Sequence, residues 1–209
     1  NEIYDQIFVI RNSSLGDKKY GNFEKFNFFK VNDSIITLGP GDYEFNEHLV
    51  IPKTHSLQIL PGTNINLLNS SRIIAYSPII MKGNKDNRIK IYSSDSTGQG
   101  LLVIQANGKS FMNYVDFNDQ SLNDLSQSTS SVLTFYESNV VINNSSFSKN
   151  ISEDIINIVR AEFDINQISI NDAISDGIDV DFGSGNISNS NFFNIGNDSI
   201  DLSGSLAKL

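Results

Sequence analysis

Acidic residues recur at a constant spacing near the C-terminal end of the sequence. Asp154, Asp176 and Asp198 are evenly spaced, and a second row with the same spacing contains Asn157, Asp179 and Asp201. Several carboxylate oxygens can hold a hard cation such as calcium, which binds oxygens at about 2.3–2.6 Å. The spacing predicts a calcium site formed by Asp176, Asp179, Asp198 and Asp201, and a ligand-binding row formed by Asn157, Asp179 and Asp201.

A simpler reading of these acidic residues stays open. Aspartate side chains at turns also accept hydrogen bonds from nearby backbone N–H groups, and outward carboxylates are often only solvated. On this reading, Asp154, Asp176 and Asp198 serve the turns in which they lie. The stacked rows would bring like charges within about 5 Å of one another, so their protons would be released as a coupled set.

The residues that follow each turn aspartate indicate how the rows are positioned. Apolar and polar residues alternate in the three runs 156–158, 178–180 and 200–202. This period of two is typical of a strand with one buried face, so Asn157, Asp179 and Asp201 point outward. Repetition of the whole unit predicts an all-β fold, a right-handed parallel β-helix with coils of about 22 residues.

A second column of the repeat supports the same fold. It contains Ile142, Ile165 and Ile187, each followed two positions later by an amide residue, namely Asn144, Gln167 and Asn189. Two interpretations of these amides stay open. They form a ladder of hydrogen bonds along the stacked coils, or they occupy turn positions whose backbone angles suit asparagine.

Upstream the repeat is looser, but strand-like runs continue at 48–51, 57–60, 64–67 and 72–75. The interval from Phe117 to Phe147 is longer than one coil, which predicts an insertion in the polar stretch 123–131. We expect residues 1–47 to form an N-terminal cap or leading coil. Residues 48–209 are expected to form the parallel β-helix, which continues into further coils or stacks on another chain beyond its C-terminus. An antiparallel sandwich is the alternative, but it does not explain the constant interval.

Charge and composition limit the partners. The net charge is −9, and residues 110–209 carry 3 basic against 14 acidic side chains. This acidic half disfavours nucleic acid, whose binding depends on clustered Lys and Arg. We expect no membrane insertion, because no apolar run approaches the roughly 20 residues of a spanning helix. The chain has no cysteine, which excludes disulfides and thiolate metal sites.

Several sequence stretches in the first half of the chain resemble the opening coils of secreted bacterial parallel β-helix proteins of the pectin-lyase-like kind. They are Val50-Ile51-Pro52 and the stretches 57–63, 73–83, 88–92, 100–104 and 114–117. The resemblance implies a pectin-lyase-like β-helix that is secreted or lies at the cell surface. It implies no single activity, because this fold carries lyases, hydrolases, epimerases and adhesins.

A second, local resemblance concerns the acidic rows. The stretches 175–179 and 196–201 are similar to strand motifs of polygalacturonase-type glycosidases. The resemblance implies that Asp176 and Asp198 are catalytic carboxylates. The sequence departs from the motif at Asn197, where a second acid is expected, and neither a downstream histidine nor an Arg-x-Lys pair follows.

These observations favour binding over catalysis. We expect an extracytoplasmic scaffold or binding surface whose partner is a polysaccharide or another protein chain. A carbohydrate-active enzyme that uses the stacked aspartates, either a glycoside hydrolase, a lyase or an epimerase, is the first alternative. A fibre or adhesin segment is the second.

Overall fold

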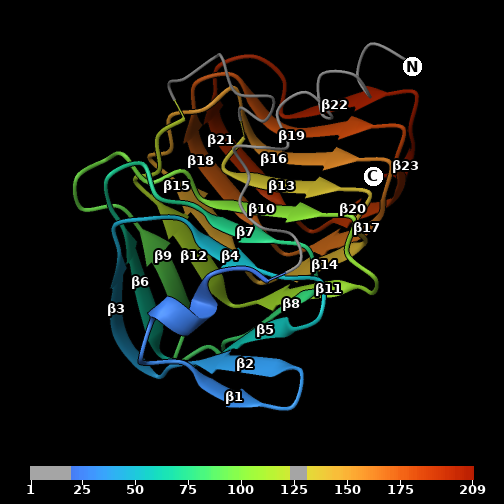
Figure 1. Cartoon of the computed structure of the whole chain (residues 1–209). Helices are drawn as coiled ribbons and strands as arrows, with labels where there is room; N and C mark the ends of the chain where they lie inside the picture. The colour runs from blue at the N-terminus through green and yellow to red at the C-terminus, as the bar shows by residue number, and fades with distance from the viewer. Residues whose placement is uncertain (1–19, 123–130) are drawn as a thin grey trace.

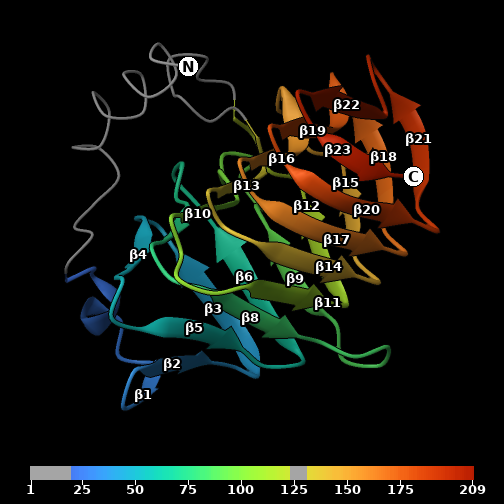
Figure 2. The same ribbon diagram turned by 90° about the vertical axis from the view of Figure 1, so that its right-hand side faces the viewer.

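The chain forms a parallel β-solenoid, described here in a computed structural model over residues 20–122 and 131–209 (Figure 1). Each coil contributes one strand to each of three sheets that run along the solenoid, as the side view in Figure 2 also shows. We call them sheets A, B and C, in the order in which the chain enters them.

The strands of each sheet are given in spatial order. Sheet A contains β1 (Lys30–Asn32), β2 (Ile35–Leu38), β5 (Ser56–Ile59), β8 (Ile79–Lys82), β11 (Ser110–Asn113), β14 (Val140–Asn143), β17 (Glu162–Asn166), β20 (Ser184–Ser188) and β23 (Leu206–Lys208). Sheet B contains β3 (Gly41–Phe45), β6 (Thr63–Leu67), β9 (Ile89–Tyr92), β12 (Val115–Asn118), β15 (Ser146–Ser148), β18 (Ser169–Ala173) and β21 (Asn191–Ile195). Sheet C contains β4 (Leu49–Ile51), β7 (Ile73–Ala75), β10 (Leu101–Ile104), β13 (Leu133–Tyr136), β16 (Asp154–Val159), β19 (Asp176–Asp181) and β22 (Ile200–Ser203).

The predicted repeat is confirmed by the strand register. Ile156 is paired with Ile178, which is paired with Ile200, so adjacent coils keep the offset that the sequence spacing predicts. Asp154 is paired with Asp176, as the first acidic row requires. The four upstream strands expected at 48–51, 57–60, 64–67 and 72–75 are β4 to β7, each displaced by no more than one residue at either end.

The described residues contain no α-helix, and no helix among them is long and apolar enough to cross a membrane. The only helical element in the described ranges is the 3-10 helix η2 (Phe23–Lys25). An all-β chain is what the abundance of β-branched residues and the scarcity of helical periodicity predict.

Coils of different length keep the same strand register. Phe117 is paired with Phe147, although the interval between them is longer than that between Ile156 and Ile178. The two phenylalanine rings stack inside the solenoid with centroids 5.5 Å apart and an interplanar angle of 8°. The insertion predicted at 123–131 lies outside the described residues except for Ser131.

The inward columns form one continuous core. Ile142, Ile165 and Ile187 are buried, as the second column of the repeat predicts. Ile178 and Val180 have no exposed surface, and Ile200 and Leu202 of the last coil are half-buried against the same core. Full burial of each such side chain contributes about 1.5–3 kcal/mol.

Left-handed backbone turns form the corners. Asn144, Gln167 and Asn189 have φ angles of 50°, 56° and 50°, which confirms the turn interpretation of the amide column. The side chains do not bond to one another: Asn144 Nδ2 donates to Asn113 Oδ1 at 2.9 Å, and Asn189 Nδ2 donates to Asn166 Oδ1 at 2.8 Å. Asn144 and Asn189 thus bond along the stacked coils, as the ladder interpretation expects, but each bonds to the amide one position earlier on the preceding coil and not to another member of the predicted column.

Serine hydroxyls join adjacent coils at the corners. The Ser145 hydroxyl accepts a hydrogen bond from the Val115 N–H of the preceding coil and donates to the Asn143 carbonyl of its own coil. The same arrangement recurs at Ser138, Ser190 and Ser205. Each hydroxyl thus satisfies one backbone N–H that the ladders leave over at a corner, and it donates to a carbonyl that also accepts a backbone hydrogen bond from the preceding coil.

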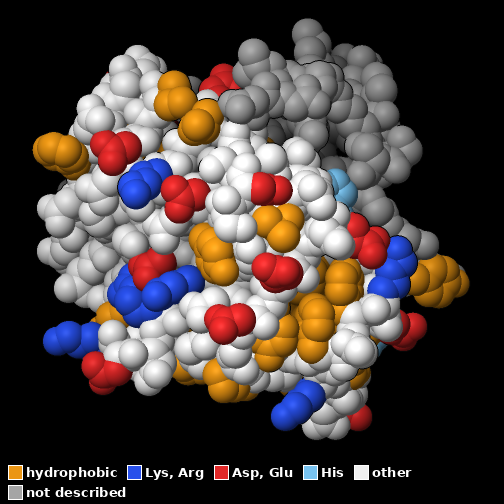
Figure 3. All heavy atoms as spheres, turned by 90° about the vertical axis from the view of Figure 1, so that its left-hand side faces the viewer, with side chains coloured by type: hydrophobic (Ala, Val, Ile, Leu, Met, Phe, Trp, Pro, Cys, Tyr) orange, Lys and Arg blue, Asp and Glu red, His pale blue; other side chains and the backbone are white. Residues whose placement is uncertain are grey.

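Aromatic residues close the N-terminal end of the solenoid. Phe26, Phe28 and Phe29 pack on one another and on Phe45 of the first coil, with ring centroids 5.0–6.2 Å apart. Apolar side chains gather in the lower part of Figure 3, the part in which Figure 1 places η2 and β1. At the other end, Leu206 remains 81% exposed, and the predicted stacking partner there stays a prediction.

The corner after sheet C provides a test of backbone strain. Phe182 has a φ of 54° and is 52% exposed, so its ring gains little burial in exchange for an unfavourable left-handed backbone. We expect Phe182→Asn to raise the free energy of unfolding by about 0.5–1 kcal/mol in urea denaturation, because asparagine tolerates this region better.

The matched control is Phe193, which is exposed in the extended strand β21. Phe193→Asn should not stabilise the protein, because strand propensity disfavours asparagine there. Equal changes in the free energy of unfolding for the two substitutions would show that backbone strain at Phe182 does not cause the stabilisation.

Candidate functional site

The outer face of sheet C changes character along the solenoid. One outward column runs through Val50, Ile74, Leu102, Thr134, Asn157, Asp179 and Asp201, each paired with the next. The side chains in this column are apolar on the first coils and acidic on the last ones. The predicted row of Asn157, Asp179 and Asp201 is therefore the acidic end of a longer column.

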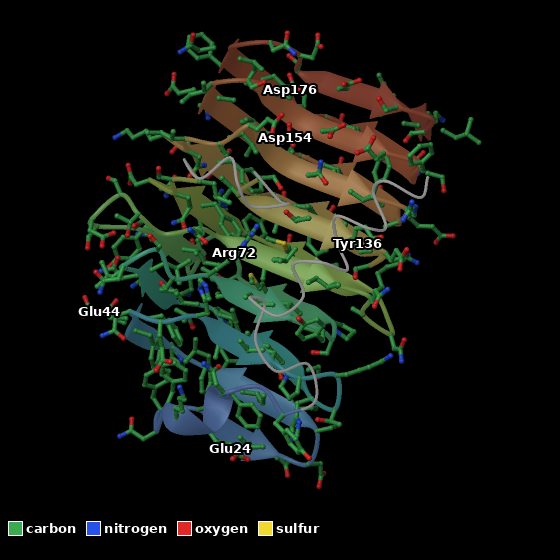
Figure 4. The ribbon with its side chains drawn as sticks, turned by 45° about the horizontal axis from the view of Figure 1, so that its top comes forward. Glu24, Glu44, Arg72, Tyr136, Asp154 and Asp176 are labelled. Atoms are coloured by element: carbon green, nitrogen blue, oxygen red, sulfur yellow. The ribbon has the colours of Figure 1, made fainter. Side chains whose placement is uncertain are left out.

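Thr134 lies where the apolar part ends. Arg72 is fully buried beside it, and the Arg72 Nη2 group donates to the Ser131 carbonyl at 2.9 Å and to Thr134 Oγ1 at 3.4 Å. Burial lowers the pKa of Arg72 to about 9. Figure 4 shows Arg72 and Tyr136 nearer the N-terminal coils, and Asp154 and Asp176 on the coils beyond them.

Asn157 bridges two carboxyl groups on this face. The Asn157 Nδ2 group lies 2.8 Å from Asp179 Oδ2 on the next coil and 3.3 Å from Asp154 Oδ2 on its own strand. Asp154, the first residue of β16, is only 7% exposed, whereas Asn157 and Asp179 are half-buried. The three side chains therefore form one polar cluster that is open to solvent at Asn157 and Asp179.

The two carboxyl groups of this cluster have raised pKa values. Burial, followed by the charges of Asp179 and Glu153, raises the pKa of Asp154 to about 8. Burial, followed by the charges of Asp181 and Asp201, raises the pKa of Asp179 to about 7.

A further aspartate, Asp181, lies on the same strand as Asp179. The pKa of Asp181 is raised by burial and by Asp201, while Arg160 opposes the shift. Asp181 is an outward residue of β19 that the two acidic rows of the sequence do not include. Its signal in the sequence is the alternation that continues past Val180, and its paired positions are Val159 and Ser203.

Asp176 and Asp198 lie side by side at the turn, as their spacing predicts. Asp176 Oδ1 accepts hydrogen bonds from the Asp198 backbone N–H at 2.9 Å and from Asn197 Nδ2 at 2.8 Å. The turn-capping interpretation is therefore confirmed for Asp176, whose carboxylate organises the next coil. The catalytic roles of Asp176 and Asp198 stay predictions.

Residues 20–122 and 131–209 contain no group of three or more His, Cys, Asp or Glu side chains arranged to hold a metal ion. The calcium site predicted at Asp176, Asp179, Asp198 and Asp201 thus has no closed set of ligands and stays a prediction. Two of its members, Asp179 and Asp201, are paired in adjacent strands on the outer face.

Comparison with models of known protein families found no matching family, and neither a curated protein nor a solved structure matched the chain. Function is therefore inferred from the geometry of the outer face of sheet C.

The raised pKa values predict a pH dependence of stability. In the unfolded chain, aspartates release their protons near pH 4, whereas the folded Asp154 and Asp179 keep theirs until about pH 8 and 7. Between these limits the unfolded state binds fewer protons, so the free energy of unfolding decreases as pH rises from 4 to 8. We expect Asp154→Asn to reduce this slope and to raise stability at pH 8 by about 1–3 kcal/mol.

Urea denaturation at pH 5, 6, 7 and 8 measures this effect. Asp95 provides a control of opposite sign, because the Asn69 N–H and neighbouring hydroxyls lower the pKa of Asp95 to about 2. Asp95→Asn should therefore destabilise the protein at neutral pH. A wild-type stability that stays constant or increases from pH 5 to 8 would contradict the raised pKa values.

Calcium binding is tested by thermal unfolding. If Asp179 and Asp201 hold calcium, a hundredfold excess over Kd adds about 2.7 kcal/mol of stability, and Asp179→Asn combined with Asp201→Asn abolishes that gain. The gain should be larger at pH 8 than at pH 6, because the cation competes with the proton on Asp179. The control is Asp164→Asn, on the outer face of sheet A, which should retain the rise in unfolding temperature with calcium. If calcium does not raise the unfolding temperature of the wild type, the calcium site is excluded.

Proposed function

We propose that the chain is an extracytoplasmic β-helix module of the pectin-lyase-like kind, which binds a polysaccharide on the acidic part of the outer face of sheet C. The observation that supports this proposal is the cluster in which Asn157 bridges the carboxyl groups of Asp154 and Asp179.

The chemistry of the cluster suits a neutral ligand rich in hydroxyl groups. A protonated carboxyl group donates one hydrogen bond and accepts others, and an amide does both as well. With pKa values of about 8 and 7, Asp154 and Asp179 retain protons close to neutral pH. The cluster thus offers donors and acceptors together, as sugar hydroxyls require.

The shape of the face supports an extended ligand. Asn157, Asp179 and Asp201 are paired across three adjacent strands, so equivalent groups recur about every 4.8 Å along the solenoid. Asp181 lies two residues from Asp179 on the same strand and widens the row. A chain molecule lying along the axis would meet similar groups at each coil.

A carbohydrate-active enzyme is the second candidate, favoured by the same pKa values. A carboxyl group that titrates near neutral pH can act as a general acid, and glycosidases pair such an acid with a second carboxylate. On this candidate, Asp154 or Asp179 is the proton donor, in place of the turn residues Asp176 and Asp198. Release of reducing ends from a polysaccharide, lost in Asp179→Asn, would distinguish the enzyme from the binding module.

Calorimetric titration with neutral and uronic-acid oligosaccharides tests the binding proposal. We expect saturable binding by the wild type, and at least a tenfold loss, about 1.4 kcal/mol, in Asn157→Ala, because that substitution removes the bridge between the two carboxyl groups.

Asn186→Ala is the matched control, since Asn186 is an exposed outward asparagine on β20 of sheet A. It should bind as the wild type does. Absence of binding to every oligosaccharide, or equal losses in Asn157→Ala and Asn186→Ala, would overturn the proposal.

A further inference from the structure

The corner that joins β10 to β11 is longer than the corresponding corner of the next coil. Five residues, 105–109, connect β10 to β11, whereas three residues, 137–139, connect β13 to β14. The strands on both sides are nevertheless in register, with Leu101 paired with Leu133 and Ser110 paired with Val140. The extra residues of the longer corner therefore protrude from the solenoid.

Hydrogen bonds to the next coil hold both ends of this corner. The Ala106 N–H donates to Ser138 Oγ at 3.0 Å, and the Ser110 N–H donates to the Asn139 carbonyl at 2.8 Å. Between these bonds, residues 107–109 are exposed, and no hydrogen bond joins them to a neighbouring coil in the described part of the chain. We call residues 107–109 the corner tip. Exposed tips of this kind have more conformational freedom than the strands that flank them.

The corner tip contains the only asparagine of the sequence that is followed by glycine, Asn107 before Gly108. The position requires glycine, because Gly108 has a φ of 130° and a Cβ atom there would lie 2.9 Å from Pro78 Cγ. The Gly108 N–H donates to the Ala106 carbonyl at 3.0 Å, which is a bond inside the same corner. Among the described residues, the Asn107 side-chain amide has no hydrogen-bond partner. The Gly108 nitrogen, which no side chain shields, thus lies next to a carboxamide that is free to rotate.

This arrangement allows a reaction that needs only water. The Gly108 backbone nitrogen, after losing its proton to base, attacks Asn107 Cγ. The new N–C bond closes a cyclic succinimide, and the Cγ–Nδ2 bond breaks with release of ammonia. Solvent water then opens the ring at either carbonyl and leaves aspartate or isoaspartate. The net change consumes water, releases ammonia and converts an amide to a carboxylate, the reaction that makes asparagine a thermolabile residue.

Three other asparagines in the described ranges precede a small residue, serine, and the fold restrains each of them. The Ser70 N–H, which contains the nitrogen that would attack Asn69, donates to Thr97 Oγ1 at 2.9 Å. The Asn144 and Asn189 side-chain amides donate to oxygens of the preceding coil at 2.9 and 2.8 Å. Succinimide formation at these positions requires a bond between coils to break, whereas at Asn107 it requires only the bond inside the corner to open.

We propose that Asn107 is a site of spontaneous deamidation, at which a surface amide becomes a carboxylate while the solenoid stays folded. Isoaspartate lengthens the backbone by one atom, and the protruding corner tip accommodates this atom without a shift of β10 or β11. The product carries a new negative charge next to Lys109 in the sequence. This modification is independent of the acidic cluster proposed to bind a polysaccharide.

Peptide mapping by mass spectrometry tests the proposal on the folded full chain. During incubation at neutral pH, the peptide that contains Asn107 should gain the mass of an amide-to-acid conversion and separate into two products of equal mass, aspartate and isoaspartate. The conversion should be severalfold faster at mildly alkaline pH, because the attacking nitrogen must first lose its proton. Peptides that contain Asn69, Asn144 and Asn189 should keep their masses.

The matched control is Asn107→Gln, which keeps an amide at the corner tip but has to close a larger and less favoured ring. This variant should lose the conversion. In the chain unfolded in guanidinium chloride, Asn69, Asn144 and Asn189 should convert as well, because the fold is what restrains them. No conversion at Asn107 in the folded chain, or conversion there at the same rate as at the other three asparagines, would overturn the proposal.

A second measurement tests whether the fold tolerates the modification. The converted protein is separated from the unconverted protein by ion exchange, since the two differ in charge. We expect both to show the circular dichroism of the β-solenoid and to unfold at the same urea concentration. Unfolding of the converted protein at a lower urea concentration would contradict the accommodation of isoaspartate by the corner tip.

Discussion

The hydrogen-bond register between successive coils is the interaction on which the rest of this structure depends. Each strand of sheets A, B and C after the first coil pairs in parallel with its counterpart one coil earlier, about 4.8 Å away. A residue is therefore always adjacent to the residue at the same position in the next coil. Equivalent side chains therefore form columns along the solenoid axis. The contribution of each column to the free energy of folding depends on which type of residue is repeated in it.

Repetition has opposite effects inside and outside the solenoid. Inside, the stacked rings of Phe117 and Phe147 gain contact from being alike. Outside, Asp179 and Asp201 are alike and repel each other, and this repulsion contributes to the raised pKa of Asp179. On the other side of Asp179, Asn157 lies between the carboxyl groups of Asp179 and Asp154 and donates to both. The acidic end of sheet C is thus less stable at neutral pH than a neutral surface would be.

The periodic part of the structure could be predicted from the sequence because the spacing of the repeat determines the register. The pairing of Ile156 with Ile178, the outward position of Asp179 and the longer coil at Phe117 all follow from spacing. The amide column could be predicted only in part, since spacing places Asn144 at a corner but does not show its hydrogen-bond partner. That partner, Asn113, belongs to a strand whose alignment is not evident in the sequence.

Burial on the outer face could not be predicted from the spacing, because alternation distinguishes inward from outward residues but does not show how exposed an outward residue is. Spacing groups Asp154 with Asp176 as a turn residue, yet only Asp154 is buried enough for so large a rise in pKa.

The corner serines have a mechanical consequence. Ser145, Ser190 and Ser205 each join two coils through the same hydroxyl, parallel to the strand ladders. Under tension at the C-terminus, the ladder bonds of the last coil would break one after another, as in a zipper, while each serine corner would add a discrete resistance before the next strand separates. Tension would therefore shorten the solenoid by single coils in a stepwise series, and the coils nearer the aromatic cap would keep their structure until last.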